Sequence, residues 1–303
     1  MPSNTSSLKP KKTYAEQLAI LKSRGLEIED EPLALHALTH HNYYRLSAYR
    51  LPYTLPNAPD KFAPGAQFGQ IWRLYVFDQD LRRFVWSACE RLELSLRARW
   101  AYVLAHSLND PLAYQNPVHF NGPGFTETKR RIEEDIKQSH EPFIDHHRQK
   151  GLLWPPIWVV SEVITFGSLT RLIRYQKEQR IRQQIANTYA LDERSFCSII
   201  HHLALIRNKV AHHARLWDNP PKIRPMLPKR APVALLRSLD YTPAALGKVY
   251  NTLVLLAHLI QCVQPGDPWP RAVRDHLHTL DPALLPRLGA PGDWAARPIW
   301  ANL

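Results

Sequence analysis

The sequence has few of the residues that build cross-linked or metal-bound cores. Only three cysteines occur among 303 residues, and no two of them have the C-x-x-C spacing. An odd, scattered set of this kind excludes a disulfide framework and a zinc cluster, and it is typical of a reducing compartment.

Long apolar segments are missing as well. The longest, Thr252–Ile260, is too short to cross a bilayer. The opening residues MPSNTSSLKPKK lack the apolar segment of a signal peptide. We therefore expect a cytoplasmic protein that makes no contact with a membrane.

Strand signals are also scarce, whereas helical spacing of apolar residues is common. The strongest helix is predicted over Gln70–His106, which contains neither proline nor glycine. An irregular proline-rich loop is expected over residues 52–64, and one clear helix, Ala244–Val263, is expected near the C-terminus. These patterns predict an all-α bundle.

Changes in composition divide the chain into three segments. Residues 1–64 are predicted to be an N-terminal helical extension, and residues 65–218 a helical core. Residues 219–303 are rich in proline and are predicted to be an appendage with that single helix.

Positive charge is in excess. The formal net charge is +12 and the pI is about 9.7, which favours polyanionic partners, nucleic acid first. The basic residues follow helices, as at Lys129–Arg131 and across 171–182, rather than forming a dense tail. Plain solubility is the alternative explanation.

The segment LIRNKVAHHARLW (Leu205–Trp217) carries the most informative pattern. Asp192 is predicted to cap the helix that carries this segment. On that helix, predicted over Ser195–His213, Arg207 falls on the rim of an apolar arc, and Asn208 and His212 share the opposite face. Arg207 and His212 point about 140° apart. The helix C-terminus favours a protonated imidazole, a form that can donate a proton.

An arginine, an asparagine and a histidine without a metal-ligand set suit RNA cleavage by the ribose 2′-hydroxyl. The guanidinium of Arg207 matches phosphate oxygens and never loses its charge. The reaction needs an acid and a base, so either His213 or the histidine of a two-fold related copy must join His212. The alternatives are a structural ion pair for Arg207 and a solvated helix end for the histidines.

The stretch from Arg207 to His212 resembles the R-N-x-x-x-H signature of HEPN-domain ribonucleases. This stretch and three further segments of the chain together resemble the Abi-type abortive infection proteins of that superfamily. Those segments are HNYYRLSAY (41–49), LYVFDQDLRRFVWSACERLELSLR (74–97) and PPIWVVSEVITFGSL (155–169).

The resemblance implies an all-α HEPN-type bundle that forms a homodimer. It also implies a metal-independent endoribonuclease without a cofactor, acting as a toxin in bacterial phage defence. Arg207 and His212 would be the catalytic pair, and Asn208 the polar residue commonly found after the arginine. Some family members are held in check by a small structured RNA.

Other residues are weaker candidates. Tyr43, Tyr44 and Arg45 place aromatic rings beside a cation, a combination that suits single-stranded RNA. Lys209 and Arg215, within and just after the motif, are further candidate RNA contacts, and Glu162 is a candidate support for the arginine or the histidine. The alternative function is a non-catalytic RNA-binding module of a defence ribonucleoprotein complex.

Overall fold

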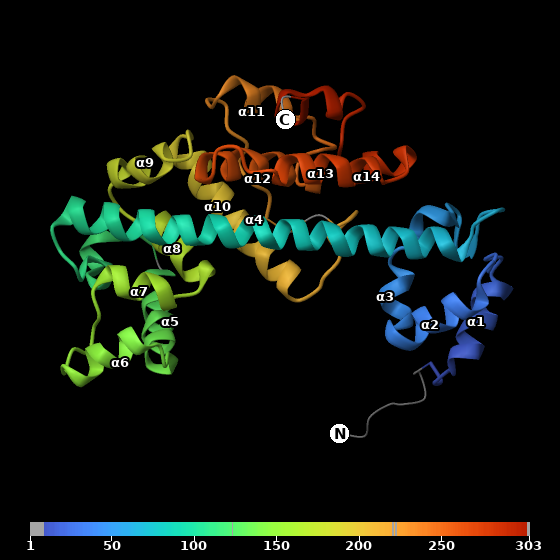
Figure 1. Cartoon of the computed structure of the whole chain (residues 1–303), viewed down its shortest axis with the longest axis horizontal. Helices are drawn as coiled ribbons and strands as arrows, with labels where there is room; N and C mark the ends of the chain where they lie inside the picture. Colours follow the sequence, from blue (N-terminus) through green and yellow to red (C-terminus); the bar gives the residue numbers. More distant parts are fainter. Residues whose placement is uncertain (1–8, 123, 220, 222, 302–303) are drawn as a thin grey trace. The chain divides into compact units, whose positions relative to one another are not determined.

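The computed structural model describes residues 9–122, 124–219, 221 and 223–301. It divides into two compact units, Met1–Asp80 and Leu81–Leu303, and the long helix α4 (Phe68–Leu108) belongs partly to each. Helices make up 65 % of the structure, so the all-α prediction is confirmed (Figure 1). Residues 1–8 of the predicted extension, and Pro220 after the motif, lie outside the described residues.

The N-terminal unit contains three short helices that begin at well-defined caps. They are α1 (Tyr14–Ser23), α2 (Glu31–His40) and α3 (Tyr43–Ser47). The Thr13 hydroxyl accepts from the Glu16 N–H at 3.2 Å while the Glu16 carboxylate accepts from the Thr13 N–H at 2.7 Å. This capping box explains where α1 starts.

The expectation of an irregular loop over residues 52–64 is wrong. A 3-10 turn (Leu51–Tyr53) leads into an antiparallel hairpin of β1 (Thr54–Leu55) and β2 (Ala58–Phe62). Each strand of a two-stranded hairpin has one unpaired edge, and proline is tolerated at such an edge because its missing N–H costs no ladder bond. Proline spacing alone therefore could not exclude strands here.

The C-terminal unit is built around α4, whose predicted bounds are confirmed to within two residues. Leu81, Val85, Leu92 and Leu96 repeat at helical spacing along it and are completely buried. The helices that follow are α5 (Gly124–Gln138), α6 (Pro142–Gln149), α7 (Ile157–Val163), α8 (Phe166–Tyr175), α9 (Gln179–Asn187) and α10 (Glu193–Ala211). Short 3-10 turns, Ala113–Gln115 and Pro117–His119, join α4 to α5.

The C-terminal region holds more helix than the one predicted. Its helices are α11 (Val233–Ser238), α12 (Val249–Val263), α13 (Trp269–His278), α14 (Leu285–Leu288) and α15 (Pro298–Ala301), with 3-10 turns at Pro282–Leu284 and Trp294–Ala296. All except α12 span ten residues or fewer, and several begin with proline in their first turn. Such short segments give little periodic signal, which is why the sequence predicted irregular chain.

This region packs onto the rest of its unit. The Trp269 indole N–H donates to the Phe84 carbonyl of α4 at 2.9 Å, and Arg91 forms an ion pair with buried Asp267. Helices α12 and α13 run beside α4 (Figure 1). Residues 219–303 therefore belong to the same compact unit as the motif helix α10, while the three-segment division of the chain stays a prediction.

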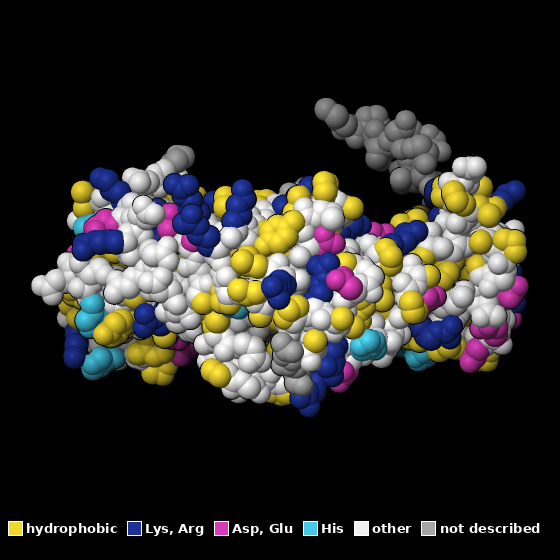
Figure 2. Space-filling view, turned by 90° about the horizontal axis from the view of Figure 1, so that it is seen from above, with side chains coloured by type: hydrophobic (Ala, Val, Ile, Leu, Met, Phe, Trp, Pro, Cys, Tyr) yellow, Lys and Arg dark blue, Asp and Glu magenta, His cyan; other side chains and the backbone are white. Residues whose placement is uncertain are grey.

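Positive charge is spread over the face drawn in Figure 2. On the face drawn in Figure 2, coloured Lys and Arg side chains stand in separate groups with hydrophobic and uncharged surface between them.

Candidate functional site

Helix α10 carries the motif and is fixed firmly at its N-terminus. The Asp192 carboxylate accepts from the backbone N–H groups of Arg194 and Ser195 at 3.1 and 3.0 Å, which confirms the predicted cap. The predicted apolar arc is buried, as expected. Packing of this arc sets the direction in which the remaining side chains of α10 point.

The back of α10 is anchored by a histidine that sequence analysis passed over. His202 is fully buried, and its ring nitrogens lie 2.8 Å from the Ile223 carbonyl oxygen and 3.0 Å from the Thr252 hydroxyl. Burial lowers the pKa of His202 to about 4, so the ring is neutral at pH 7. This histidine ties α10 to α12 and has no access to a substrate.

Arg207 reaches from α10 to α4. Its Nη2 donates to the Glu93 carboxylate at 3.0 Å, and its guanidinium carbon lies 5.6 Å from the centre of the Trp86 ring. Nη1 donates to the Asn208 side-chain oxygen at 3.3 Å. The guanidinium is therefore held in one orientation by a carboxylate, an aromatic face and the neighbouring asparagine.

Glu93 joins two arginines, and sequence analysis did not identify it. Its side chain is only 9 % exposed, and its second carboxylate oxygen accepts from Arg97. Arg97 in turn donates to the Ser161 carbonyl of α7. A signal was present, because Glu93 and Arg97 stand four residues apart beside the fully buried Leu92 and Leu96.

These groups surround a hollow of about 270 Å³, which we call the Arg207 hollow. Helices α4, α7 and α10 contribute its lining, which is Trp86, Glu90, Glu93, Leu94, Arg97, Glu162 and Arg207. Glu162 thus lies in the same hollow as Arg207, but Glu93 makes the contact to the guanidinium. The supporting role of Glu162 stays a prediction.

Cys89 lies close enough to Glu93 and Arg207 to feel both charges. Burial raises the pKa of the Cys89 thiol to about 12. A thiol with that pKa stays protonated at neutral pH, so it is not a nucleophile.

The histidines lie at the end of α10, which begins and ends two residues earlier than predicted. The helix ends at Ala211, His212 is the C-cap, and His213 adopts a left-handed conformation with φ of 56°. The N–H groups of His213 and Ala214 donate to the carbonyls of Val210 and Lys209 at 2.9 and 3.0 Å. This is a Schellman motif, and it ends the helix at Ala211.

The motif side chains therefore divide between two environments. Arg207 is half-buried and faces Glu93, whereas Asn208 and His212 are exposed. His213 is exposed beyond the helix end. Within one chain, the structure links Asn208 to Arg207 but gives no contact between Arg207 and His212 among the described residues.

Hydrogen bonds hold the loop that follows the motif. The Lys209 ammonium donates to the Asn219 backbone carbonyl, and the Arg215 backbone carbonyl accepts from the Asn219 side chain at 3.0 Å. Asp218 forms ion pairs with Lys248 and Arg287, each at 3.1 Å. The loop after the motif is thereby fixed to the C-terminal region.

The remaining candidates, Tyr43, Tyr44 and Arg45, lie on α3 of the N-terminal unit. Tyr43 and Tyr44 line a pocket of their own, and Arg45 is exposed outside its lining. Among the described residues, no group of three or more His, Cys, Asp or Glu side chains is arranged to hold a metal ion. Over the same residues, no helix combines the length and the apolar character needed to span a bilayer.

The fold and the site define an all-α protein with an arginine–carboxylate centre beside the exposed histidines of a helix end. The chain belongs to the family of Abi-like proteins, whose model matches residues 36–218. The matched region includes α4, α7 and α10 and hence the whole Arg207 hollow. The chain matches no curated protein and no solved structure. Family membership indicates a role in abortive infection, a form of phage defence.

Proposed function

We propose that this protein is a metal-independent endoribonuclease that acts as a toxin in abortive infection, with Arg207 and His212 as its catalytic residues. One observation carries the proposal. Arg207 is held in a fixed orientation at an open hollow, and Asn208 and His212 are exposed on the last turns of the same helix. The resemblance of this segment to the HEPN signature supports the same assignment.

The proposed reaction needs only groups that the chain supplies. A histidine takes the proton of a ribose 2′-hydroxyl, and the resulting oxygen attacks the adjacent phosphorus. The bond to the 5′ oxygen breaks as a second histidine protonates it, which leaves a 2′,3′-cyclic phosphate and a 5′-hydroxyl. Arg207 stabilises the extra negative charge of the phosphorane.

The second histidine is proposed to come from a two-fold related copy. Arg207 and His212 leave α10 on different sides, so a facing copy would bring complementary groups to one phosphate. Trp86 and Leu94 line the Arg207 hollow, Trp158 lies one turn before Glu162, and all three are exposed. Exposed apolar side chains beside a site favour an interface there.

The alternative is a non-catalytic RNA-binding module, and one observation favours it. Arg207 already has an ion-pair partner in Glu93, which is what a structural arginine at a helix interface would have. In that case the parent chain would not cleave RNA, and replacing Arg207 would change stability alone.

The experiment compares four single variants of the full chain on a mixed RNA pool. Arg207→Ala and His212→Ala should each lower cleavage by about a hundred- to a thousand-fold, the usual effect of losing one transition-state group. Arg194→Ala and His201→Ala are matched controls, because both residues lie on α10 away from the hollow. Cleavage that survives His212→Ala at the parent rate would refute the assignment.

The dimer is tested separately by light scattering together with activity at decreasing protein concentration. Trp158→Asp should weaken association and cleavage together, whereas Val118→Asp, at an equally exposed apolar position remote from α7 in sequence, should not. Full activity from a monomer at nanomolar concentration would exclude the shared site. The acid would then have to be His213.

The proposal includes RNA partners. The substrate is RNA, and a small structured non-coding RNA is proposed as the antitoxin because the Abi-type resemblance implies one. Arg45, Lys209 and Arg215 are retained as candidate contacts to either RNA. Lys209 would have to exchange its bond to the Asn219 carbonyl for a phosphate.

A further inference from the structure

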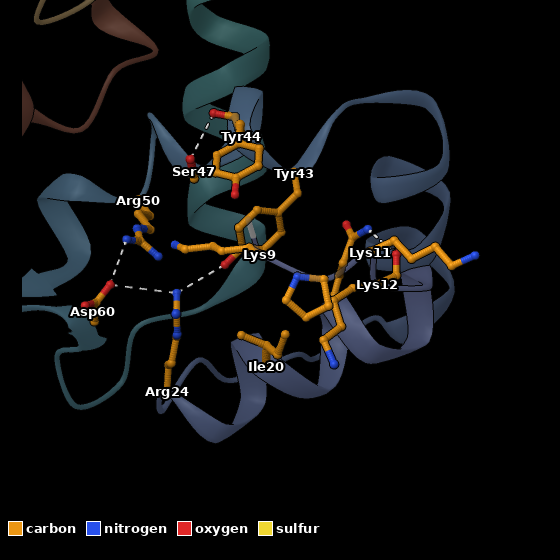
Figure 3. Close-up of a pocket in the computed structure, with 12 residues that line it drawn as sticks. Lys9, Lys11, Lys12, Ile20, Arg24, Tyr43, Tyr44, Ser47, Arg50 and Asp60 are labelled. Atoms are coloured by element: carbon orange, nitrogen blue, oxygen red, sulfur yellow. Dashed lines mark hydrogen bonds and ion pairs between the residues drawn. The ribbon is translucent and has the colours of Figure 1, made fainter. Parts of the chain in front are cut away.

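The N-terminal unit contains a pocket of about 480 Å³, which we call the Tyr43 pocket (Figure 3). The segment before α1, then α1, α3 and β2 contribute to it. Its lining is Lys9, Pro10, Lys11, Lys12, Gln17, Ile20, Arg24, Tyr43, Tyr44, Ser47, Arg50 and Asp60. More than a third of these residues precede residue 36, where the family match begins.

Two arginines converge on one side of the Tyr43 pocket. Arg24 donates to the Tyr43 hydroxyl at 3.2 Å, and the Asp60 carboxylate lies 3.4 Å from Arg50 and 3.9 Å from Arg24 (Figure 3). Asp60 is 78 % exposed, whereas Arg50 is only 16 % exposed. An exposed carboxylate binds a guanidinium weakly, so an anion entering the pocket can displace it or share the two arginines.

The charge of the pocket is strongly one-sided. Five cationic side chains line it, Lys9, Lys11, Lys12, Arg24 and Arg50, against the single carboxylate of Asp60. Lys12 also has Glu16 within 3.3 Å outside the lining. If that pair is counted as neutral, the pocket still has an excess of three positive charges. Such an excess attracts an anionic ligand such as a phosphate.

Aromatic surface lies next to these cations. The rings of Tyr43 and Tyr44 stand perpendicular to each other with their centres 5.7 Å apart, and Tyr44 is 66 % exposed. An exposed aromatic ring beside a guanidinium is a platform for a nucleobase. An acidic peptide would use the cations but would gain nothing from the rings.

We propose that the Tyr43 pocket binds a nucleoside phosphate, with the phosphate on Arg24 and Arg50 and the base against Tyr44. The volume lies within the range of pockets that enclose small ligands. The three lysines along the rim extend the positive charge beyond one phosphate, which favours single-stranded RNA over a free nucleotide. This site goes beyond the proposed cleavage and does not depend on it.

The test measures binding, using the full chain with His212→Ala to limit cleavage and a fluorescently labelled 12-nucleotide single-stranded RNA. A gel run in parallel verifies that the RNA stays intact. Arg50→Ala and Tyr44→Ala should each weaken binding about tenfold, through a lost charge-assisted bond and a lost stacking surface respectively. Lys61→Ala is the matched control, since Lys61 follows Asp60 on β2 and lies outside the lining.

Competition then identifies the source of the nucleotide. If RNA is the ligand, adenosine monophosphate displaces it only at concentrations at least a hundredfold above the Kd of the RNA. If free nucleotides are the ligand, the monophosphate binds as tightly as the RNA, and Tyr44→Ala weakens both.

Three results would overturn the proposal: parent affinity in both pocket variants, an equal loss in Lys61→Ala, or inorganic phosphate competing as well as the nucleotide. Thermal unfolding of every variant excludes a misfolded N-terminal unit as the cause. Because binding is measured without turnover, the result stands whether or not the chain cleaves RNA.

Discussion

The Arg207 hollow and the Tyr43 pocket surround their arginines with opposite charge. In the hollow, two arginines face three glutamates, and Glu93 binds both arginines directly. In the pocket, five cations face one exposed aspartate. A polyanion is therefore repelled weakly by the first site and attracted strongly by the second.

This difference in charge suggests different roles: the hollow orients Arg207, and the pocket binds an anionic ligand. Glu93 holds Arg207 in place at the cost of neutralising it, which suits a group that must meet charge developing in a transition state. The Tyr43 pocket keeps an excess of three positive charges, which suits binding of the ground state. We therefore expect variants of the two sites to affect different kinetic constants.

The largest expected effect is a split between kcat and KM. His212→Ala should lower kcat about a hundred- to a thousand-fold with little change in KM. Arg50→Ala should raise KM about tenfold and leave kcat unchanged, because its pocket contributes binding only. Steady-state kinetics on one defined RNA measures both constants. Loss of kcat in Arg50→Ala would break the distinction between the two sites.

Glu93→Gln should lower the stability of the fold. It leaves Arg97 and Arg207 without their shared counter-charge, and breaking a buried pair in this way costs about 3 kcal/mol. Glu90→Gln is the matched control, because Glu90 lines the same hollow but is exposed. Urea unfolding measures both free energies, and equal stability of the two variants would show that Glu93 does not hold the arginines.

Acid should weaken the anchor behind α10. His202 has a pKa lowered by burial to about 4, against 6.5 when unfolded, so the unfolded chain binds its proton first. This contribution to stability is complete above about pH 6.5 and is lost as the pH falls toward 4. His202→Gln should flatten the dependence of the unfolding free energy over that interval.

Burial also lowers the pKa of His258. His258 therefore changes the unfolding free energy with pH in the same direction in the parent and in His202→Gln, and its contribution cancels when the two are compared. An identical slope in the parent and in His202→Gln would contradict a buried neutral His202.

The smallest expected effect concerns the helix end. His213 has φ of 56°, where a side chain costs about 1 kcal/mol relative to glycine. His213→Gly should therefore be about 1 kcal/mol more stable than His213→Ala in thermal unfolding, and both should cleave RNA like the parent. Loss of cleavage in both variants would move the proton-transfer role to His213.

The sequence was sufficient for what depends on local pattern. The spacing of Leu81, Val85, Leu92 and Leu96 predicted α4, and Asp192 predicted the start of α10. The end of α10 was misplaced because the Schellman turn uses His213 where glycine is usual. The short proline-containing helices after residue 221 are stabilised by burial of residues such as Trp269 and Trp300, which leaves no periodic signal.

Contacts between segments that are distant in the chain could not be predicted from the sequence. Glu93 lies 114 residues before Arg207, and many glutamates could equally have been its partner. The Tyr43 pocket depends on Arg24, Arg50 and Asp60 meeting through the hairpin that was expected to be an irregular loop. Tyr43 and Tyr44 were noticed for their chemistry, but only the fold brings the arginines to them.

The most direct test of the central claim is the chemistry of the RNA ends. The full chain is incubated with a defined RNA in excess EDTA, and the products are analysed by mass spectrometry beside those of the His212→Ala chain. We expect 2′,3′-cyclic phosphate and 5′-hydroxyl ends from the parent and almost no product from the variant. Products with 5′-phosphate ends that require Mg²⁺, or equal cleavage by both chains, would contradict the claim.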